Sequence, residues 1–184
     1  MPNWCSNDLE VSGEKQDLMN FKLFARGKGR DNVEETAFDE NKFAPYPEKF
    51  QLIDERADED QRLWQKEIEK AGVAKMSEKD KEAWHKAHPH RMMEDGYNQG
   101  GYDWCIANWG ARGICQAELY SETDTKLNYG FDTAWSPPIP LVKKMGEMFL
   151  KLKFKLVYKE EGMGFKGNFT MKNGQVWKDW CKNT

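Results

Sequence analysis

The stretch from Asp132 to Gly167 constrains the fold most, because it specifies a strand, a helix and a second strand in direct succession. The Ser-Pro-Pro-Ile-Pro run at 136–140 ends the first strand and begins a helix, since proline is tolerated in the first helical turn. Apolar side chains then recur at helical spacing: Val142, Met145 and Phe149. They next alternate along a strand: Phe154, Leu156 and Tyr158. These elements make up half of a compact α+β unit.

The rest of the chain completes this unit. Period-two alternation of apolar residues predicts further strands near residues 4–12, 115–119, 127–133 and 165–171. Helical spacing predicts a helix from Asp17 to Arg26. The order β-α-β-β-α-β is that of a ferredoxin-like split βαβ fold, an antiparallel sheet with both main helices on one face. The Asn173-Gly174 pair predicts a C-terminal hairpin, in which the tail from Gln175 to Cys181 is either an edge strand or a short helix.

A long segment from about residue 27 to residue 113 interrupts this order. We therefore expect a single domain over residues 1–184 with a mostly helical insertion. One charged helical segment spans about Asp60 to Ala71, and a second begins at Ser77, where Ser77 and Asp80 resemble a capping box. Helices with so few apolar residues cannot form a core alone, so we expect them to pack against the rest of the domain or against a partner.

Composition and charge exclude several classes of protein. The net charge of −3 argues against a protein whose main task is to neutralise phosphates. The N-terminus lacks the basic start and apolar run of a signal peptide, and nothing approaches the ~20 apolar residues of a membrane helix. We expect a cytoplasmic protein of a bacterial host, with no membrane partner. Cys5 and Cys115 are expected on the helix-facing side of the sheet and reduced.

Five motifs occur in consistent order over most of the chain: Pro2 to Asn7, Phe43 to Pro47, Trp104 to Gly110, Asp132 to Pro138 and Glu161 to Phe165. In these residues the chain resembles the YubB-like proteins of enterobacterial plasmids and phages. After Gly110 it has Ala-Arg-Gly-Ile where that pattern has Thr-Lys-Trp, so the turn into the next strand is expected to differ. The resemblance implies a ferredoxin-like fold and a mobile-genetic-element origin, and it carries over no catalytic residues.

Few motifs point to catalysis, a cofactor or a metal. The Gly-x-Gly-x-x-Gly at 162–167 lacks a following helix pattern, so we read it as a hairpin turn and not as a dinucleotide fingerprint. His85, His88 and His90 lie close together, but Pro89 interrupts them and a third ligand is not evident, so no metal site is predicted and the question stays open. We predict no catalytic residues and no cofactor.

Nucleic-acid binding is the main alternative, because a ferredoxin-like sheet can present aromatic side chains that stack on bases. Alternation predicts a polar, partly acidic open face: Asp8, Glu10, Gln116, Glu118, Asn128 and Asp132. These carboxylates would repel phosphate, and Lys153 and Lys155, expected on an edge strand, do not reverse that. A nucleic-acid role is therefore disfavoured at this face and left open elsewhere.

Aromatic residues flank the expected junctions between the sheet and the insertion. As the binding site we predict a cleft there, lined by Trp104, Asn108, Trp109, Asp132 and Trp135, with Trp109 and Trp135 as anchors; a core role for them stays the alternative. The predicted function is that of a non-catalytic accessory protein of a phage or plasmid that engages a host protein, in a role that suits counter-defence. The alternatives are an RNA- or DNA-binding module and a small enzyme of unknown reaction.

Overall fold

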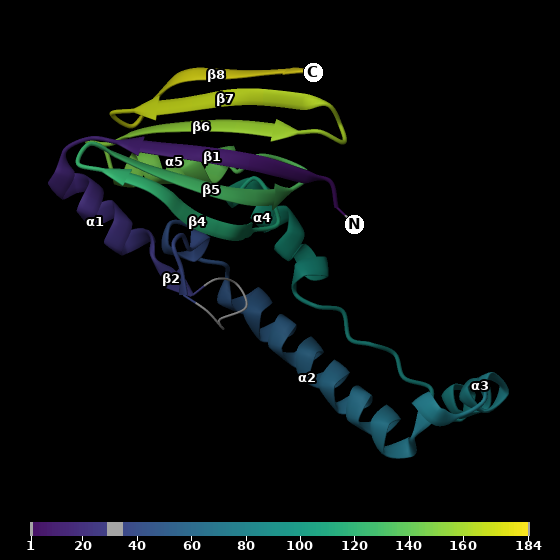
Figure 1. Cartoon of the computed structure of the whole chain (residues 1–184). Helices are drawn as coiled ribbons and strands as arrows, with labels where there is room; N and C mark the ends of the chain where they lie inside the picture. Colours follow the sequence, from purple (N-terminus) through teal and green to yellow (C-terminus); the bar gives the residue numbers. More distant parts are fainter. Residues whose placement is uncertain (1, 29–34, 184) are drawn as a thin grey trace. The chain divides into compact units, whose positions relative to one another are not determined.

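Six strands form one antiparallel sheet in the order β4-β5-β1-β6-β7-β8 (Figure 1). The computed structural model describes residues 2–28 and 35–183. The strands are β1 (Trp4–Ser12), β4 (Ile114–Thr123), β5 (Lys126–Ala134), β6 (Lys153–Glu160), β7 (Phe165–Lys172) and β8 (Gln175–Asn183). Because β1 lies between β5 and β6, the four strands of the βαββαβ order pair as the ferredoxin-like fold requires. The predicted fold is confirmed.

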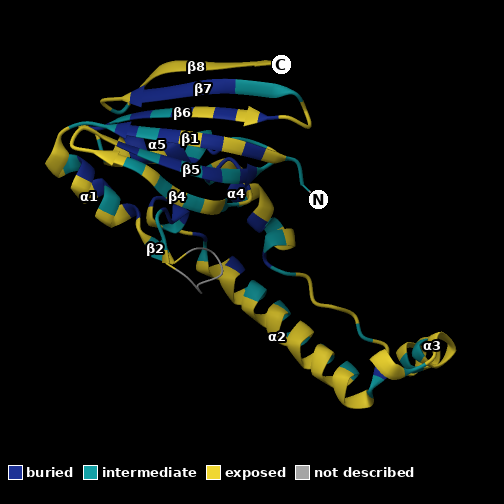
Figure 2. Ribbon diagram, viewed as in Figure 1, coloured by how far each residue is buried: buried dark blue, intermediate teal, exposed yellow. Residues whose placement is uncertain are grey.

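Helices α1 (Lys15–Ala25) and α5 (Ile139–Met148) cover the same face of this sheet (Figure 1). The Phe21 ring of α1 lies 5.4 Å from Phe154 of β6 and 6.1 Å from Tyr129 of β5, measured between ring centroids. It also lies 5.2 Å from Phe149, the residue that caps α5. Each large apolar side chain fully buried in such a core contributes ~1.5–3 kcal/mol. Figure 2 shows the resulting alternation of buried and exposed residues along β1 and β6.

The chain divides into two compact units, Met1–Pro45 with Asp103–Thr184, and Tyr46–Tyr102. The second unit is narrower than the predicted insertion, of which residues 29–34 lie outside the described part. Both flanks of that insertion belong to the first unit. They contain β2 (Gly27–Lys28), β3 (Glu35–Thr36), the 3₁₀ turn η1 (Glu40–Lys42) and most of α4 (Tyr102–Asn108). The N-terminal flank packs into the core: the Phe38 ring stacks on Phe131 of β5 at a centroid distance of 5.8 Å.

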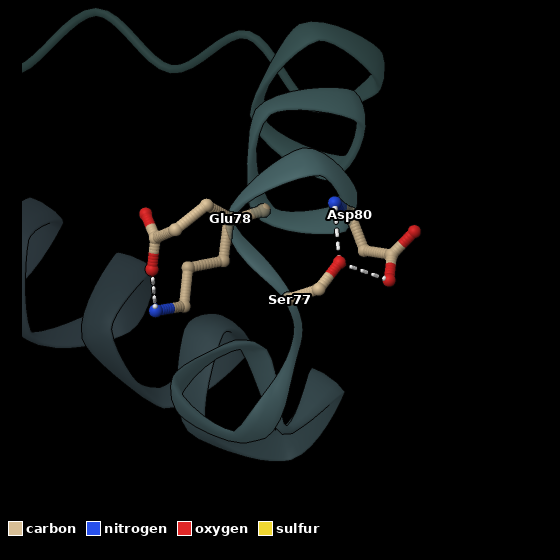
Figure 3. Close-up of polar contacts among 4 residues, drawn as sticks. Ser77, Glu78 and Asp80 are labelled. Atoms are coloured by element: carbon tan, nitrogen blue, oxygen red, sulfur yellow. Dashed lines mark hydrogen bonds and ion pairs between the residues drawn. The ribbon is translucent and has the colours of Figure 1, made fainter.

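The second unit contains two helices, α2 (Glu48–Ala71) and α3 (Glu78–Ala87), and the turns η2 (Val73–Lys75) and η3 (Tyr97–Gly101). Helix α2 begins at Glu48, earlier than the predicted Asp60, and its first turns carry Phe50, Leu52 and Ile53 among charged residues, with Phe50 buried. The N-cap contact of the predicted capping box is present: the backbone N–H of Asp80 donates to Ser77 Oγ at 3.3 Å (Figure 3). The Asp80 carboxylate accepts from the Ser77 hydroxyl at 2.6 Å, whereas in a capping box it accepts from the N-cap backbone N–H.

Aromatic stacking holds the helices of the second unit together. The Trp64 ring of α2 lies 5.4 Å from Trp84 of α3, and His90 stacks on Trp64 at 4.5 Å. His90 Nε2 also lies 3.1 Å from Asp60, and His88 stacks on Trp84 at 4.4 Å. The clustered histidines thus pack against tryptophans. Among residues 2–28 and 35–183, no three His, Cys, Asp or Glu side chains are placed to hold a metal ion.

The environment of Cys115 differs from the prediction. Cys5 is fully buried on the helix-facing side, but Cys115 is exposed and lies opposite Asp132, on the open side. The cause is a bulge after Cys115, where Gln116 takes a positive φ of 53° and shifts the alternation by one residue.

None of the four cysteines, all of them within the described residues, forms a disulfide. Within the same described residues, no helix combines the length and the apolarity that crossing a bilayer requires.

Candidate functional site: the open face of the sheet

Three of the five predicted site residues form a packed group on α4 and just after it. The Trp109 side chain is 2% exposed, and its indole Nε1–H donates to the carbonyl oxygen of Ala44 at 2.8 Å. The Trp104 ring meets it edge-on at 5.2 Å, and Asn108 Nδ2 donates to the Trp104 carbonyl at 2.9 Å. Trp109 is therefore part of the core.

The other two predicted residues lie at the end of β5. Asp132 is half-buried on the open face of the sheet, opposite Ser6 of β1. Trp135 is 52% exposed and adopts a positive φ of 71°, with its N–H donating to the Asn3 carbonyl at 2.9 Å. Trp135 differs from the buried Trp109 in exposure, although its neighbour Ser136 donates through Oγ to the carbonyl of Gly110, the residue after Trp109, at 2.6 Å. The five residues therefore form two groups, and the second faces solvent.

A cavity of about 400 Å³ lies at the same end of the sheet as Trp135. Trp4, Ser6 and Lys159 contribute side chains to it from the open face, and the β6–β7 turn contributes Glu161. Glu160, also at its edge, is buried and accepts hydrogen bonds from the backbone N–H groups of the turn. That carboxylate therefore fixes the turn and is not available to a ligand. Trp4 is 46% exposed, so the cavity opens beside an aromatic surface.

Strand register shows which side chains share the open face. Leu9 and Val11 are fully buried under the helices, so their neighbours Asp8 and Glu10 point the other way. Residues paired across strands share a face, which adds Asp132 of β5 and Glu118 of β4. We call Asp8, Glu10, Glu118 and Asp132 the acidic half. These four residues lie on the face predicted from the sequence, as does Asn128 opposite Glu10, whereas Gln116 lies in the bulge of β4.

Across β6, β7 and β8 the same face is basic. Pairing with β1 places Lys153, Lys155 and Lys159 of β6 on it. Pairing onward adds two lysines of β7 and two of β8: Lys166, Lys172, Lys178 and Lys182. We call these seven residues the lysine half. Glu160 and Asp179, the acidic residues of β6 and β8, lie on the opposite side, because they pair with the buried Cys5 and Phe169. The lysine half therefore contains no carboxylate.

Among residues 2–28 and 35–183, one member of the lysine half forms an ion pair. Lys159 pairs with Glu161 of the adjacent turn at 2.6 Å. Over the described residues, no other member of the lysine half has an acidic oxygen within 4.0 Å. None of the seven side chains is buried. The result is a solvated cluster of positive charge on a protein whose net charge is −3.

The boundary between the two halves follows the β1–β6 pairing. Lys126 hydrogen-bonds Glu10 at 2.8 Å and lowers the pKa of that carboxyl, and the nearby Lys155 and Lys153 add to the effect. On the acidic side, partial burial and the Asp8 carboxylate raise the pKa of Tyr120, whose hydroxyl donates to Asp8 at 3.4 Å. Glu10 is therefore ionised at neutral pH, with Lys126 of β5 as its charge partner.

Sequence reasoning missed the lysine half because it treated β6 as an edge strand. In the structure, β7 and β8 extend the sheet beyond it. The sequence does contain a pattern typical of one strand face, with a polar or aromatic residue at every second position. It occurs in two runs, Lys166-x-Asn168-x-Thr170-x-Lys172 and Lys178-x-Trp180-x-Lys182. Assigning the tail as a strand would have placed both runs on the face of Lys153 and Lys155.

Comparison with known proteins bears on the fold. Residues 116–183 match a family described as the ferredoxin-like domain in Api92-like proteins. The structure resembles the crystal structure of the protein api92 from Yersinia pseudotuberculosis with a TM-score of 0.54 and 11% sequence identity, covering 100% of this chain and 99% of that one. Comparison with curated proteins gave no match. The C-terminal part of this chain is thus similar to the ferredoxin-like domain of Api92-like proteins.

Proposed function

We propose that this protein is a non-catalytic binding module whose lysine half binds nucleic acid. The observation that carries the proposal is the register of β6, β7 and β8, which gathers seven lysines on one solvated face without a carboxylate among them. Clustered lysines attract phosphates and release the counterions that surround a nucleic acid. Trp180 lies within the cluster and is 36% exposed, which gives the face an aromatic surface.

The net charge does not oppose this function. Overall charge sets long-range attraction, but contacts are made by the local field, and ions screen charges beyond ~8 Å at physiological salt. The acidic half begins one strand away from Lys155, at Glu10. Phosphates are therefore attracted to β6–β8 and repelled from β1, β5 and β4. The bound nucleic acid is confined to the lysine half of the open face.

The test is oligonucleotide binding by the full chain and by a triple variant, K166Q/K178Q/K182Q. We expect the variant to bind about tenfold more weakly at low salt, and its plot of log affinity against log salt to lose about 2 from its slope. The matched control is K70Q/K79Q/K86Q, which removes three exposed lysines from the second unit. Equal losses in both variants, or no binding by the unmodified protein, would refute the proposal.

A second candidate function, binding of a host protein, is favoured by a different observation. Trp4 and Trp135 are 46% and 52% exposed at the end of the sheet that bears the cavity, and exposed tryptophans are enriched at protein interfaces. Trp135→Ala and Asp132→Asn should then reduce capture of the partner without a matching loss of stability. Capture that falls only in proportion to stability would remove this candidate.

The cellular setting is also a proposal. The motif resemblance to YubB-like proteins supports an origin in a plasmid or phage and an accessory role in the bacterial cytoplasm, for which counter-defence is one use. Expression from a plasmid or prophage during transfer or infection, followed by fractionation of the host cell, would test this setting. Recovery of the protein outside the cytoplasmic fraction would contradict it.

A further inference from the structure

The lysine half is ordered in rows that run across the strands. One row consists of Val157, Asn168 and Trp180, which lie opposite one another on β6, β7 and β8 and carry no charge. The row on one side of it is Lys159, Lys166 and Lys182. The row on the other side is Lys155, Thr170 and Lys178. Along each strand, residues on one face are ~6.6 Å apart, so a neutral strip lies between two lysine rows.

Trp180 is the aromatic group of the neutral strip. The Lys178 and Lys182 ammonium groups lie 5.9 and 5.8 Å from the centroid of its ring. Lys172 lies 5.2 Å from the ring of Trp177, which is 64% exposed in the bulge of β8. An indole between two ammonium groups offers a stacking surface for a base and charges for the phosphates on either side of it.

The width of the sheet disfavours a duplex. Six strands at ~4.8 Å spacing are ~24 Å wide, and the major groove of B-DNA is ~12 Å wide. The face therefore cannot enter a groove, and a duplex would expose only its phosphates to it, with every base stacked inside. Within the neutral strip Asn168 is buried, whereas Val157 and Trp180 are exposed, so a single-stranded nucleic acid can stack a base on Trp180 and lay its backbone on a lysine row.

We infer that the lysine half binds single-stranded nucleic acid, with one base stacked on Trp180 and the flanking phosphates on Lys178 and Lys182 and their neighbours in the rows. This inference rests on the proposed function and names the form of its ligand. The acidic half sets the limit of the site, because the neutral row continues onto Asp8 of β1. The footprint is therefore short and lies over β6, β7 and β8.

The experiment measures fluorescence anisotropy of the full chain with three probes at one salt concentration: a 12-nucleotide single strand, the matching blunt duplex, and heparin as a competitor. The variants are Trp180→Ala, Trp180→Phe and, as a control, Tyr102→Ala, which removes an exposed aromatic side chain outside the lysine half. Thermal unfolding of each variant accompanies the binding curves. Trp180 lies on the edge strand β8, and the Phe variant keeps an aromatic ring at its position.

We expect the single strand to bind at least tenfold more tightly than the duplex. Trp180→Ala should lose about tenfold in affinity for the single strand, the loss typical of one stacked base, and Trp180→Phe should lose little. Tyr102→Ala should bind as the unmodified protein does. Equal affinity for the duplex, equally tight binding of heparin, or an unchanged Trp180→Ala would overturn the inference. If the duplex binds equally well or Trp180→Ala is unchanged, the proposed function still stands, provided that K166Q/K178Q/K182Q weakens oligonucleotide binding. The proposed function falls if the unmodified protein binds no nucleic acid.

Discussion

Glu10 of β1 and Lys155 of β6 lie directly opposite one another, and the charge of the open face changes sign between them. On the Glu10 side the face carries the acidic half, and on the Lys155 side it carries the lysine half. Neighbouring strands are ~4.8 Å apart, so the change occurs within less than a Debye length at physiological salt. The acidic half therefore acts on any anion that binds to the lysine half.

Removal of one acidic charge should strengthen nucleic-acid binding. Asp8 lies opposite Val157 in the neutral row, and Asp8→Asn keeps the shape of the side chain and an acceptor for the Tyr120 hydroxyl. We expect a gain of about twofold to fivefold at low salt that disappears near 1 M salt, where the Debye length is ~3 Å. Asp58→Asn on α2 is the matched control. If the control gains as much affinity, or if the gain does not depend on salt, repulsion by the Asp8 carboxylate is not the cause of the gain in nucleic-acid affinity.

The two tryptophans predicted as anchors should behave differently. Trp109→Ala leaves a cavity in the core and removes the donor to Ala44, so we expect it to lower the free energy of unfolding by ~3–5 kcal/mol. Trp135→Ala changes a side chain that is 52% exposed and should cost less than ~1 kcal/mol. Urea denaturation followed by circular dichroism measures both. Similar costs for the two variants would contradict the placement of Trp135 at the surface.

The sequence predicted the fold well because burial on one face leaves a strong periodic signal. Leu9 and Val11, Phe154 and Leu156, and the Pro-led helix of residues 139–148 each lie where alternation or helical spacing placed them. Cys115 did not, because a bulge at Gln116 changes the face without changing the composition.

The site was harder to predict for two physical reasons. Periodicity assigns side chains to faces only within a helix or strand, and Trp109 and Trp135 come directly after α4 and β5. Trp109 in the core and Trp135 at the surface therefore looked alike in sequence. In addition, all nine residues of β8 are exposed, so its alternation does not separate apolar from polar positions. Without β8, neither Trp180 nor its flanking lysines could be placed beside Lys155.

The thiols should fall into two classes of reactivity. Burial raises the pKa of Cys5 to about 12, although a hydrogen bond with Thr133 opposes the effect, so almost no thiolate forms at neutral pH. Cys105 is also buried, whereas Cys115 and Cys181 are exposed. In native protein at pH 8, we expect rapid alkylation of Cys115 and Cys181, with Cys5 and Cys105 labelled after denaturation. Peptide mass spectrometry identifies the sites. Rapid native labelling of Cys5 would contradict the described core.

The cap of α3 gives a local test of the second unit. Ser77→Ala removes the oxygen that accepts from the Asp80 N–H and should destabilise α3 by ~1 kcal/mol (Figure 3). Ser77→Asp supplies another capping oxygen and is the control. Hydrogen exchange of the amides at residues 78–81 should accelerate in the Ala variant and stay near the original rate in the Asp variant. Unchanged exchange in both would show that the cap contributes nothing to α3.

A lysine footprint tests directly whether the lysine half binds single-stranded nucleic acid. Limited acetylation of the full chain, with and without a saturating single-stranded oligonucleotide, is read by peptide mass spectrometry for every lysine. We expect strong protection of Lys155, Lys166, Lys178 and Lys182, and unchanged modification of the exposed lysines of the second unit, Lys70, Lys79 and Lys86. Protection of the second set with no protection of the first would place nucleic-acid binding elsewhere and contradict the assignment of the open face.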